Sequence, residues 1–170
     1  MKIFFTIVCL VCLTGCATSH GHSAHAVAEI KPTQGNQANG LIIFEQKKDG
    51  LTASIELVGL TPGPHGFHIH ENGDCSANDA MSAGGHYNPY GKSHGAPEIA
   101  NHHAGDLGNI IADEAGNVKV QLKLSGLSLA GENDHIVGRS VIMHARADDL
   151  TSQPAGNSGA RIACGAIQQR

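Results

Sequence analysis

Short runs in which apolar and polar residues alternate recur from Ala26 to the end of the chain, and turn residues separate them. Alternation with a period of two is typical of β-strands with one buried face, and no stretch keeps a helical period over two or more turns. Lys47-Lys48-Asp49-Gly50 and the segment 113–117 are typical of hairpin turns. We predict strands over residues 26–31, 41–46, 51–58, 66–70, 118–124, 138–145 and 160–167.

Seven or eight strands of this kind predict an all-β fold, an eight-stranded Greek-key β-barrel or immunoglobulin-like sandwich. Two long segments interrupt the strand rhythm, from Glu71 to about Ala104 and from Ala147 to Gly159. Long segments without regular structure in a compact domain usually carry function. We therefore expect two long functional loops. Because histidines gather in and beside the first loop, we expect this loop to need a metal and a disulfide at Cys75 to become ordered.

The N-terminus is typical of an export signal. Lys2 is followed by a nearly continuous apolar run, residues 3–13, which is too short to span a bilayer comfortably. Leu13-Thr14-Gly15-Cys16 resembles the lipobox of bacterial lipoproteins, in which the cysteine is acylated after cleavage, whereas an ordinary signal peptide cleaved nearby is the alternative. We interpret residues 1–15 as a lipoprotein-type signal peptide, 16–25 as a histidine-containing tether and 26–170 as one domain. The expected location is the periplasm or cell envelope, with Cys16 as a possible anchor in the outer membrane.

The cysteines agree with export. Of the five, Cys9 and Cys12 lie in the segment to be removed and Cys16 would be lipidated. Cys75 and Cys164 remain as an even pair in an oxidising compartment, which predicts a disulfide worth roughly 4–5 kcal/mol, although two free thiols acting as soft metal ligands are the alternative. The net charge of −4, without a basic stripe, argues against nucleic acid as a partner.

Histidines are the candidate chemistry of this chain. His68-Ile69-His70 places two imidazoles on one face of a predicted strand, where both reach the same metal ion. Any one histidine is more often a surface residue, but six imidazoles and a carboxylate in a short chain suit copper and zinc above all. Besides His68 and His70, the set contains His86, His94, His103, Asp106 and His144. The tether adds His20, His22 and His25, which bind a metal weakly or serve only as a soluble linker.

Several motifs together resemble the copper/zinc superoxide dismutases of the bacterial, periplasmic type. They keep the order of that family and cover nearly all of residues 26–170. The motifs are Gly66-Phe67-His68-Ile69-His70-Glu71, Gly84-Gly85-His86-Tyr87-Asn88-Pro89, His94-Gly95, His103-Ala104-Gly105-Asp106-Leu107-Gly108-Asn109, Gly138-Arg139-Ser140, His144 with Ala147-Asp148-Asp149-Leu150, and Gly156-Asn157 with Ala160-Arg161-Ile162-Ala163-Cys164-Gly165.

The resemblance implies two metal sites that share one ligand. Copper would be held by His68, His70, His86 and His144. Zinc would be held by His86, His94, His103 and Asp106, so that His86 bridges the two metals. Asp148 would accept hydrogen bonds from His68 and His94, although an ordinary solvated acid is the alternative. Arg161 would dock superoxide beside copper, whereas a surface arginine is the ordinary expectation at that position.

The implied activity is the dismutation of superoxide to dioxygen and peroxide by redox cycling of copper beside a structural zinc, with Arg161 and His86 as the catalytic residues. In the envelope it would protect against extracytoplasmic superoxide. The His-x-x-Asp spacing favours His103 over His102 as a ligand, and His65 and His135 are expected to be structural or exposed. A non-catalytic metal buffer, a zinc hydrolase and a structural lipoprotein are the alternatives. Both a monomer and a bacterial-type homodimer fit the sequence, and Lys92 and Arg161 are the obvious positive charges for steering an anion.

Overall fold

The computed structural model describes residues 25–170, so the expected signal peptide, most of the tether and Cys16 lie outside the described residues. This part of the chain is all-β, as predicted, with one short 3-10 turn, η1 (Met81–Ala83). The eight strands are β1 (His25–Pro32), β2 (Asn39–Lys47), β3 (Gly50–Val58), β4 (Gly63–His70), β5 (Asp106–Ala112), β6 (Val118–Leu124), β7 (Ser140–His144) and β8 (Arg161–Gln169).

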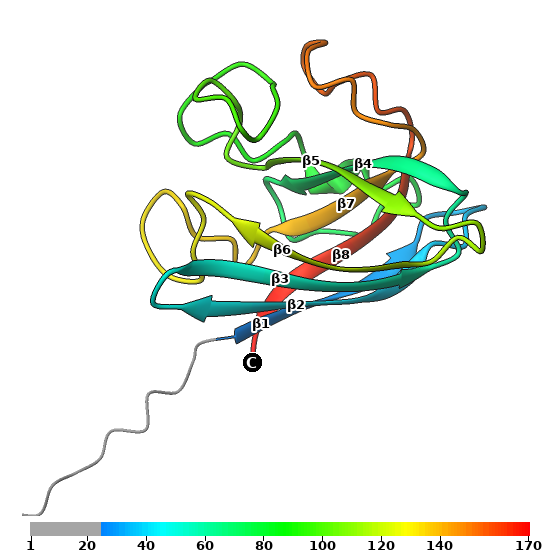
Figure 1. The fold of residues 1–170 in the computed structure, drawn as a ribbon, viewed down its shortest axis with the longest axis horizontal. Helices are drawn as coiled ribbons and strands as arrows, with labels where there is room; N and C mark the ends of the chain where they lie inside the picture. Colours follow the sequence, from blue (N-terminus) through cyan, green and yellow to red (C-terminus); the bar gives the residue numbers. More distant parts are fainter. Residues whose placement is uncertain (1–24) are drawn as a thin grey trace, which may run out of the picture.

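The strands follow one another in the order β5-β4-β7-β8-β1-β2-β3-β6, and each neighbouring pair is antiparallel. The sheet curls so that its edge strands β5 and β6 approach each other and nearly close a barrel (Figure 1). The connections from β3 to β4 and from β6 to β7 each pass over two strands, which is the Greek-key arrangement. Curling of this kind protects the two edge strands of the sheet.

Alternation along the strands builds the core. On β3, Leu51, Ala53, Ile55 and Leu57 are buried while the residues between them are more exposed. β4 and β7 depart from this pattern, because residues 65–70 and the whole of β7 are buried. Their outward faces are covered by the two long loops, residues 71–105 and 145–160. This covering turns the outer surface of β4 and β7 into a second buried compartment.

The two long loops lie on the same side of the barrel, one drawn in green and the other in orange (Figure 1). The predicted disulfide is confirmed: Cys75 in the first loop is joined to Cys164 on β8, and the sulfurs pack with Ala80, Ala83 and Ile142. A third connection, residues 125–139, is also long and has no counterpart in the two loops expected from the sequence. Within residues 25–170 no helix is long and apolar enough to cross a bilayer.

One strand was missing from the seven ranges predicted. β5 begins at Asp106, and its glycine at position 108 has a φ of 75°, which interrupts the regular alternation by which strands are recognised. It forms a strand because it pairs with β4, with a register shift between Gly66 and His68 that sets His68 opposite Asp106. The pairing therefore brings the first histidine pair beside the only carboxylate of the predicted ligand set.

Candidate metal centre

The first group of histidines lies on the outward face of β4 and β7. His68 and His70 point away from the core side chains of Phe67 and Ile69, as expected from their spacing on one strand. His86 joins them from the first long loop through an isolated bridge to His70, and His144 joins them from the end of β7. The four ring nitrogens lie within 4.8 Å of one another and all four residues are buried.

Hydrogen bonds on the far side of three of these rings assign their protons. His70 donates Nδ1–H to the Gly84 carbonyl at 3.0 Å, and His144 donates Nδ1–H to the Gly159 carbonyl at 3.2 Å. His68 donates Nε2–H to Oδ2 of Asp148 at 2.7 Å. Each neutral ring therefore turns a lone pair toward the others, and those inner nitrogens have no hydrogen-bond partner in the described chain. Converging buried lone pairs are what a metal ion satisfies.

The second group centres on Asp106. Oδ1 of this carboxylate lies 2.7 Å from Nδ1 of His86, 3.0 Å from Nδ1 of His94 and 3.2 Å from Nδ1 of His103. Oδ2 accepts hydrogen bonds from the amides of Gly95 and His103 at 3.1 and 2.8 Å. Three imidazole nitrogens and one carboxylate oxygen, all buried, form the second cluster of potential ligands.

The two groups share His86. Its Nδ1 faces Asp106, and its Nε2 lies in the first group and has no partner in residues 25–170. The rings of His86 and His68 are 4.0 Å apart between centroids, and those of His86 and His103 are 5.5 Å apart. One imidazole thus lies between the two clusters and presents one nitrogen to each.

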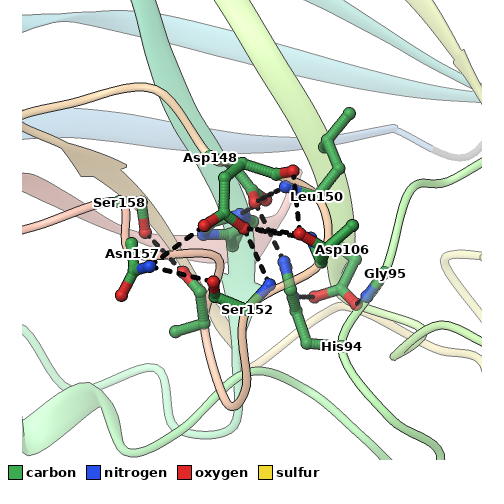
Figure 2. A network of polar contacts seen from close by, with 12 residues as sticks. His94, Gly95, Asp106, Asp148, Leu150, Ser152, Asn157 and Ser158 are labelled. Atoms are coloured by element: carbon green, nitrogen blue, oxygen red, sulfur yellow. Dashed lines mark hydrogen bonds and ion pairs between the residues drawn. The ribbon is translucent and has the colours of Figure 1, made fainter.

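Asp148 links the two groups a second time, on the opposite side. Its Oδ2 accepts from His68, and its Oδ1 lies 2.9 Å from Nε2 of His94. Figure 2 shows His94 between the two carboxylates of Asp148 and Asp106. A neutral His94 that donates Nε2–H to Asp148 turns a lone pair toward the carboxylate of Asp106. A cation between these groups removes that repulsion, so the donors fit a bound metal.

Two side-chain amides hold the loop that carries Asp148. Asn109 on β5 donates to the Asp148 carbonyl at 2.9 Å and accepts from its amide at 2.7 Å. Gln153 in the same loop makes the equivalent pair of bonds with the main chain of His94, at 2.9 and 2.8 Å. Gly156 lies so close that a Cβ there would stand 1.7 Å from Oδ1 of Asp148. These clamps join segments far apart in the chain, so no local sequence pattern predicts them.

Arg161 lies beside the first group. It is the residue opposite His144 in the pairing of β7 with β8, and it donates to the carbonyls of Ala80 and Gly84 at 2.8 and 2.7 Å. The Gly84 carbonyl is the one that also accepts from His70, so one carbonyl positions both side chains. Burial lowers the pKa of the Arg161 guanidinium, which nevertheless stays charged as arginine does in proteins.

Burial keeps the imidazoles of His68 and His144 neutral and able to bind a metal. It lowers the pKa of His68 to about 4, against the opposing effect of the hydrogen bond that His68 donates to Asp148, and it lowers the pKa of His144 to about 3. For Asp106 burial raises the pKa, but the hydrogen bond with His86 and the amides of Gly95 and His103 outweigh it and hold the pKa well below its usual range. The compartment therefore offers neutral nitrogens together with an ionised carboxylate near pH 7.

The remaining histidines stay outside both groups. His103 contributes to the second group whereas His102 turns away and donates to the His103 carbonyl, in line with the spacing argument. His65 is buried and donates Nδ1–H to the His144 carbonyl at 2.7 Å, which gives it a structural position under a candidate ligand. His135 is half-buried in the third connection. His20 and His22 lie outside the described residues.

The fold and the site define an all-β metalloprotein with two adjoining clusters of imidazole ligands. Its sequence matches the family described as copper/zinc superoxide dismutase (SODC) over residues 38–167. It is 44% identical over 154 residues to the extracellular superoxide dismutase [Cu-Zn] of Brugia pahangi. The alignment covers 85% of this chain and 76% of that relative. The chain belongs to the copper/zinc superoxide dismutase family, and it is an enzyme that uses copper and zinc.

A solved structure shares this fold. The structure titled "Crystal Structure Analysis of the clock protein EA4" matches with a TM-score of 0.78 and 39% identity, over 86% of this chain and 94% of that one. The family match and the Brugia relative confirm the family expected from the sequence. The Brugia relative is a eukaryotic extracellular enzyme, so the bacterial, periplasmic subtype stays a prediction.

Proposed function

We propose that superoxide is dismutated at the first group of histidines, with copper on His68, His70, His86 and His144, and zinc on His86, His94, His103 and Asp106. The observation that carries the proposal is the set of buried nitrogens that converge beside the guanidinium of Arg161 and have no hydrogen-bond partner within residues 25–170. Bound copper supplies the one-electron oxidation and reduction of superoxide, and zinc keeps the shared imidazole in place.

Arg161 binds the substrate in this proposal. Superoxide is an anion, and the guanidinium is a positive charge that adds to burial in lowering the pKa of His70 and His144. Its bonds to the carbonyls of Ala80 and Gly84 fix the plane of the guanidinium before the substrate arrives. Pre-positioned charge of this kind stabilises a bound anion without further reorganisation.

His86 and Asp148 have separate tasks. Nε2 of His86 faces the first group, where it takes up a proton and returns it to the reduced substrate. Nδ1 of the same ring stays directed at Asp106. Asp148 fixes the orientation of His68 and His94, one residue from each group, and so acts on both metals through hydrogen bonds.

We further propose that the enzyme works outside the cytoplasm. The Cys75–Cys164 disulfide supports an oxidising compartment, and the extracellular Brugia relative supports a secreted location. Periplasmic retention through a lipid on Cys16 is the finer proposal. Mass spectrometry of the processed N-terminus tests it: a diacylglycerol-modified Cys16 supports the anchor, and a free N-terminus at another residue contradicts it. A monomer and a homodimer remain the two proposed states, which sedimentation distinguishes.

The function is tested on purified chain loaded with copper and zinc, with metal content and dismutation measured together. We expect His144→Ala to lose copper and activity, and His103→Ala to lose zinc. The matched control is His102→Ala. The His102 ring is next to His103 in sequence but lies outside both groups, so its removal should leave both metals in place. Full loading of the unaltered chain without turnover would contradict the proposal and favour a metal buffer.

A further inference from the structure

The main chains of three residues form a closed ring of backbone hydrogen bonds, the peptide ring, between the ligand-bearing segments. The amide of Ile69 donates to the Gly105 carbonyl at 2.9 Å, the amide of Gly105 donates to the Tyr87 carbonyl at 2.8 Å, and the amide of Tyr87 donates to the Ile69 carbonyl at 2.8 Å. Each of the three residues both donates to and accepts from another member of the ring. The ring therefore fixes three chain segments relative to one another.

The three corners adjoin five of the seven candidate ligands, all but His94 and His144. Ile69 lies between His68 and His70, and Tyr87 follows His86 directly. Gly105 lies between His103 and Asp106. The ring thus ties β4, which belongs to the first group, to the segment before β5, which belongs to the second group. The segment of the shared imidazole lies between these two.

The close approach at Gly105 requires glycine. A Cβ at this position would stand 2.2 Å from the Ile69 carbonyl oxygen and 3.0 Å from the Tyr87 amide nitrogen. Gly105 does not have the positive φ that favours glycine, so the constraint is the space between peptides rather than backbone conformation. An alanine would have to push the two peptides apart by about 1 Å to reach ordinary van der Waals contact.

The Tyr87 corner is also held from outside the loop. Its ring is buried, its hydroxyl donates to the Asn133 carbonyl at 2.9 Å, and the guanidinium carbon of Arg139 lies 3.4 Å from the ring centroid. Arg139 in turn donates to the carbonyls of His135 and Glu71 at 2.9 and 3.0 Å. The third connection of the barrel therefore supports the loop that carries His86.

We propose that this peptide ring, supported by the Tyr87–Arg139 stack, is a positioning element that presets both ligand groups before any metal binds. The inference rests on the ligand roles proposed above. Its physical basis is that the three bonds are made between main-chain groups and need no metal. The proposal therefore departs from the expectation that the whole first long loop becomes ordered only when a metal binds. Ligands held within about 0.5 Å of their working positions lose little freedom on binding, which raises affinity. A displacement of either corner shifts ligands of copper and zinc together, because the ring spans the two groups.

Amide hydrogen exchange on the full chain, loaded and then stripped of metals by chelation, tests the presetting. We expect the amides of Ile69, Tyr87 and Gly105 to stay protected without metals, at the level of a core amide such as that of Ile55. Protection that appears only after metals are added would overturn the proposal, because the ring would then follow metal binding. This measurement does not use dismutase activity, so its result is independent of the proposed function.

A matched pair of glycine variants tests the coupling. Gly105→Ala should weaken the binding of copper and of zinc by at least about tenfold each and change the electron paramagnetic resonance spectrum of bound copper. Gly85→Ala is the control, because it adjoins His86, lacks a positive φ and leaves a Cβ no closer than 3.7 Å to the neighbours recorded there. Unchanged affinities in Gly105→Ala, or the loss of one metal alone, would overturn the proposal.

If Gly105→Ala does not fold, Arg139→Gln is the second variant, since it keeps the peptide ring and removes the stack on Tyr87. We expect exchange of the Tyr87 amide in the metal-free chain to become at least about tenfold faster, while the amide of Ile55 stays unchanged. Equal exchange in both chains would remove Arg139 from the positioning element and contradict the proposal as stated.

Discussion

Removal of the Cys75–Cys164 disulfide should lower the free energy of unfolding by an amount that follows from the length of the loop it closes. The change is Cys75→Ala together with Cys164→Ala, which cuts a link across a sequence separation of 89 residues. In the chain-entropy model a loop of this length confines the unfolded chain by about 4.6 kcal/mol at 25 °C. We therefore expect the free energy of unfolding to fall by about 4–5 kcal/mol, a large part of the stability of an ordinary domain.

The same variant should also weaken substrate binding. Cys75 anchors the loop that carries the carbonyls of Ala80 and Gly84, and these two carbonyls hold the guanidinium of Arg161. A looser loop lets the positive charge move away from the first ligand group. We expect kcat/KM to fall about tenfold, which corresponds to roughly 1.4 kcal/mol, while copper and zinc content stay unchanged.

The assay is urea unfolding of metal-free protein, followed by circular dichroism, with activity measured separately on loaded protein. Wild-type chain reduced by a thiol is the control, because it loses the cross-link and keeps both buried sulfurs. A loss in the double variant alone would come from the packing of the sulfurs with Ile142 rather than from the cross-link. Losses below about 1 kcal/mol in both samples would refute the entropy argument.

Three further predictions follow from the site. Asp148→Asn should weaken copper and zinc binding by roughly 10–100-fold in chelator competition. Asp149→Asn is the control, because Asp149 contacts only groups of its own loop, and equal effects of the two variants would contradict the bridging role of Asp148. Arg161→Gln should lower kcat/KM and its dependence on salt while copper content stays constant, and a normal salt dependence would place substrate binding elsewhere. For metal-free protein, the contribution of His68 to the free energy of unfolding should be fully present above about pH 6.5 and be lost as the pH falls to about 4. The expected loss is about 3 kcal/mol from His68 alone, because the imidazole of the unfolded chain takes up its proton at a higher pH than the buried ring does, and a flat profile would contradict the buried neutral ring.

Local patterns carried most of the fold. Alternation on segments such as 51–58 and 118–124 predicted strands with the bounds observed within one residue, because the period of side-chain burial is a property of each strand by itself. β5 could not be found this way. Its glycine at position 108 breaks the pattern, and the strand exists through its pairing with β4.

The site likewise combines features that local sequence predicts with features that only tertiary contacts create. The sequence by itself determined which side chains are available, since the spacing of His68 and His70 and the later histidines gave the candidate set. The family resemblance divided that set into the two groups that the structure brings together. Tertiary structure decided how these side chains are held, through the Asn109–Asp148 and Gln153–His94 clamps and the peptide ring at Gly105. Such contacts join residues as many as 59 positions apart, as between Gln153 and His94. Their geometry depends on how the strands close and the loops fold over them, and no local pattern of residues encodes that arrangement.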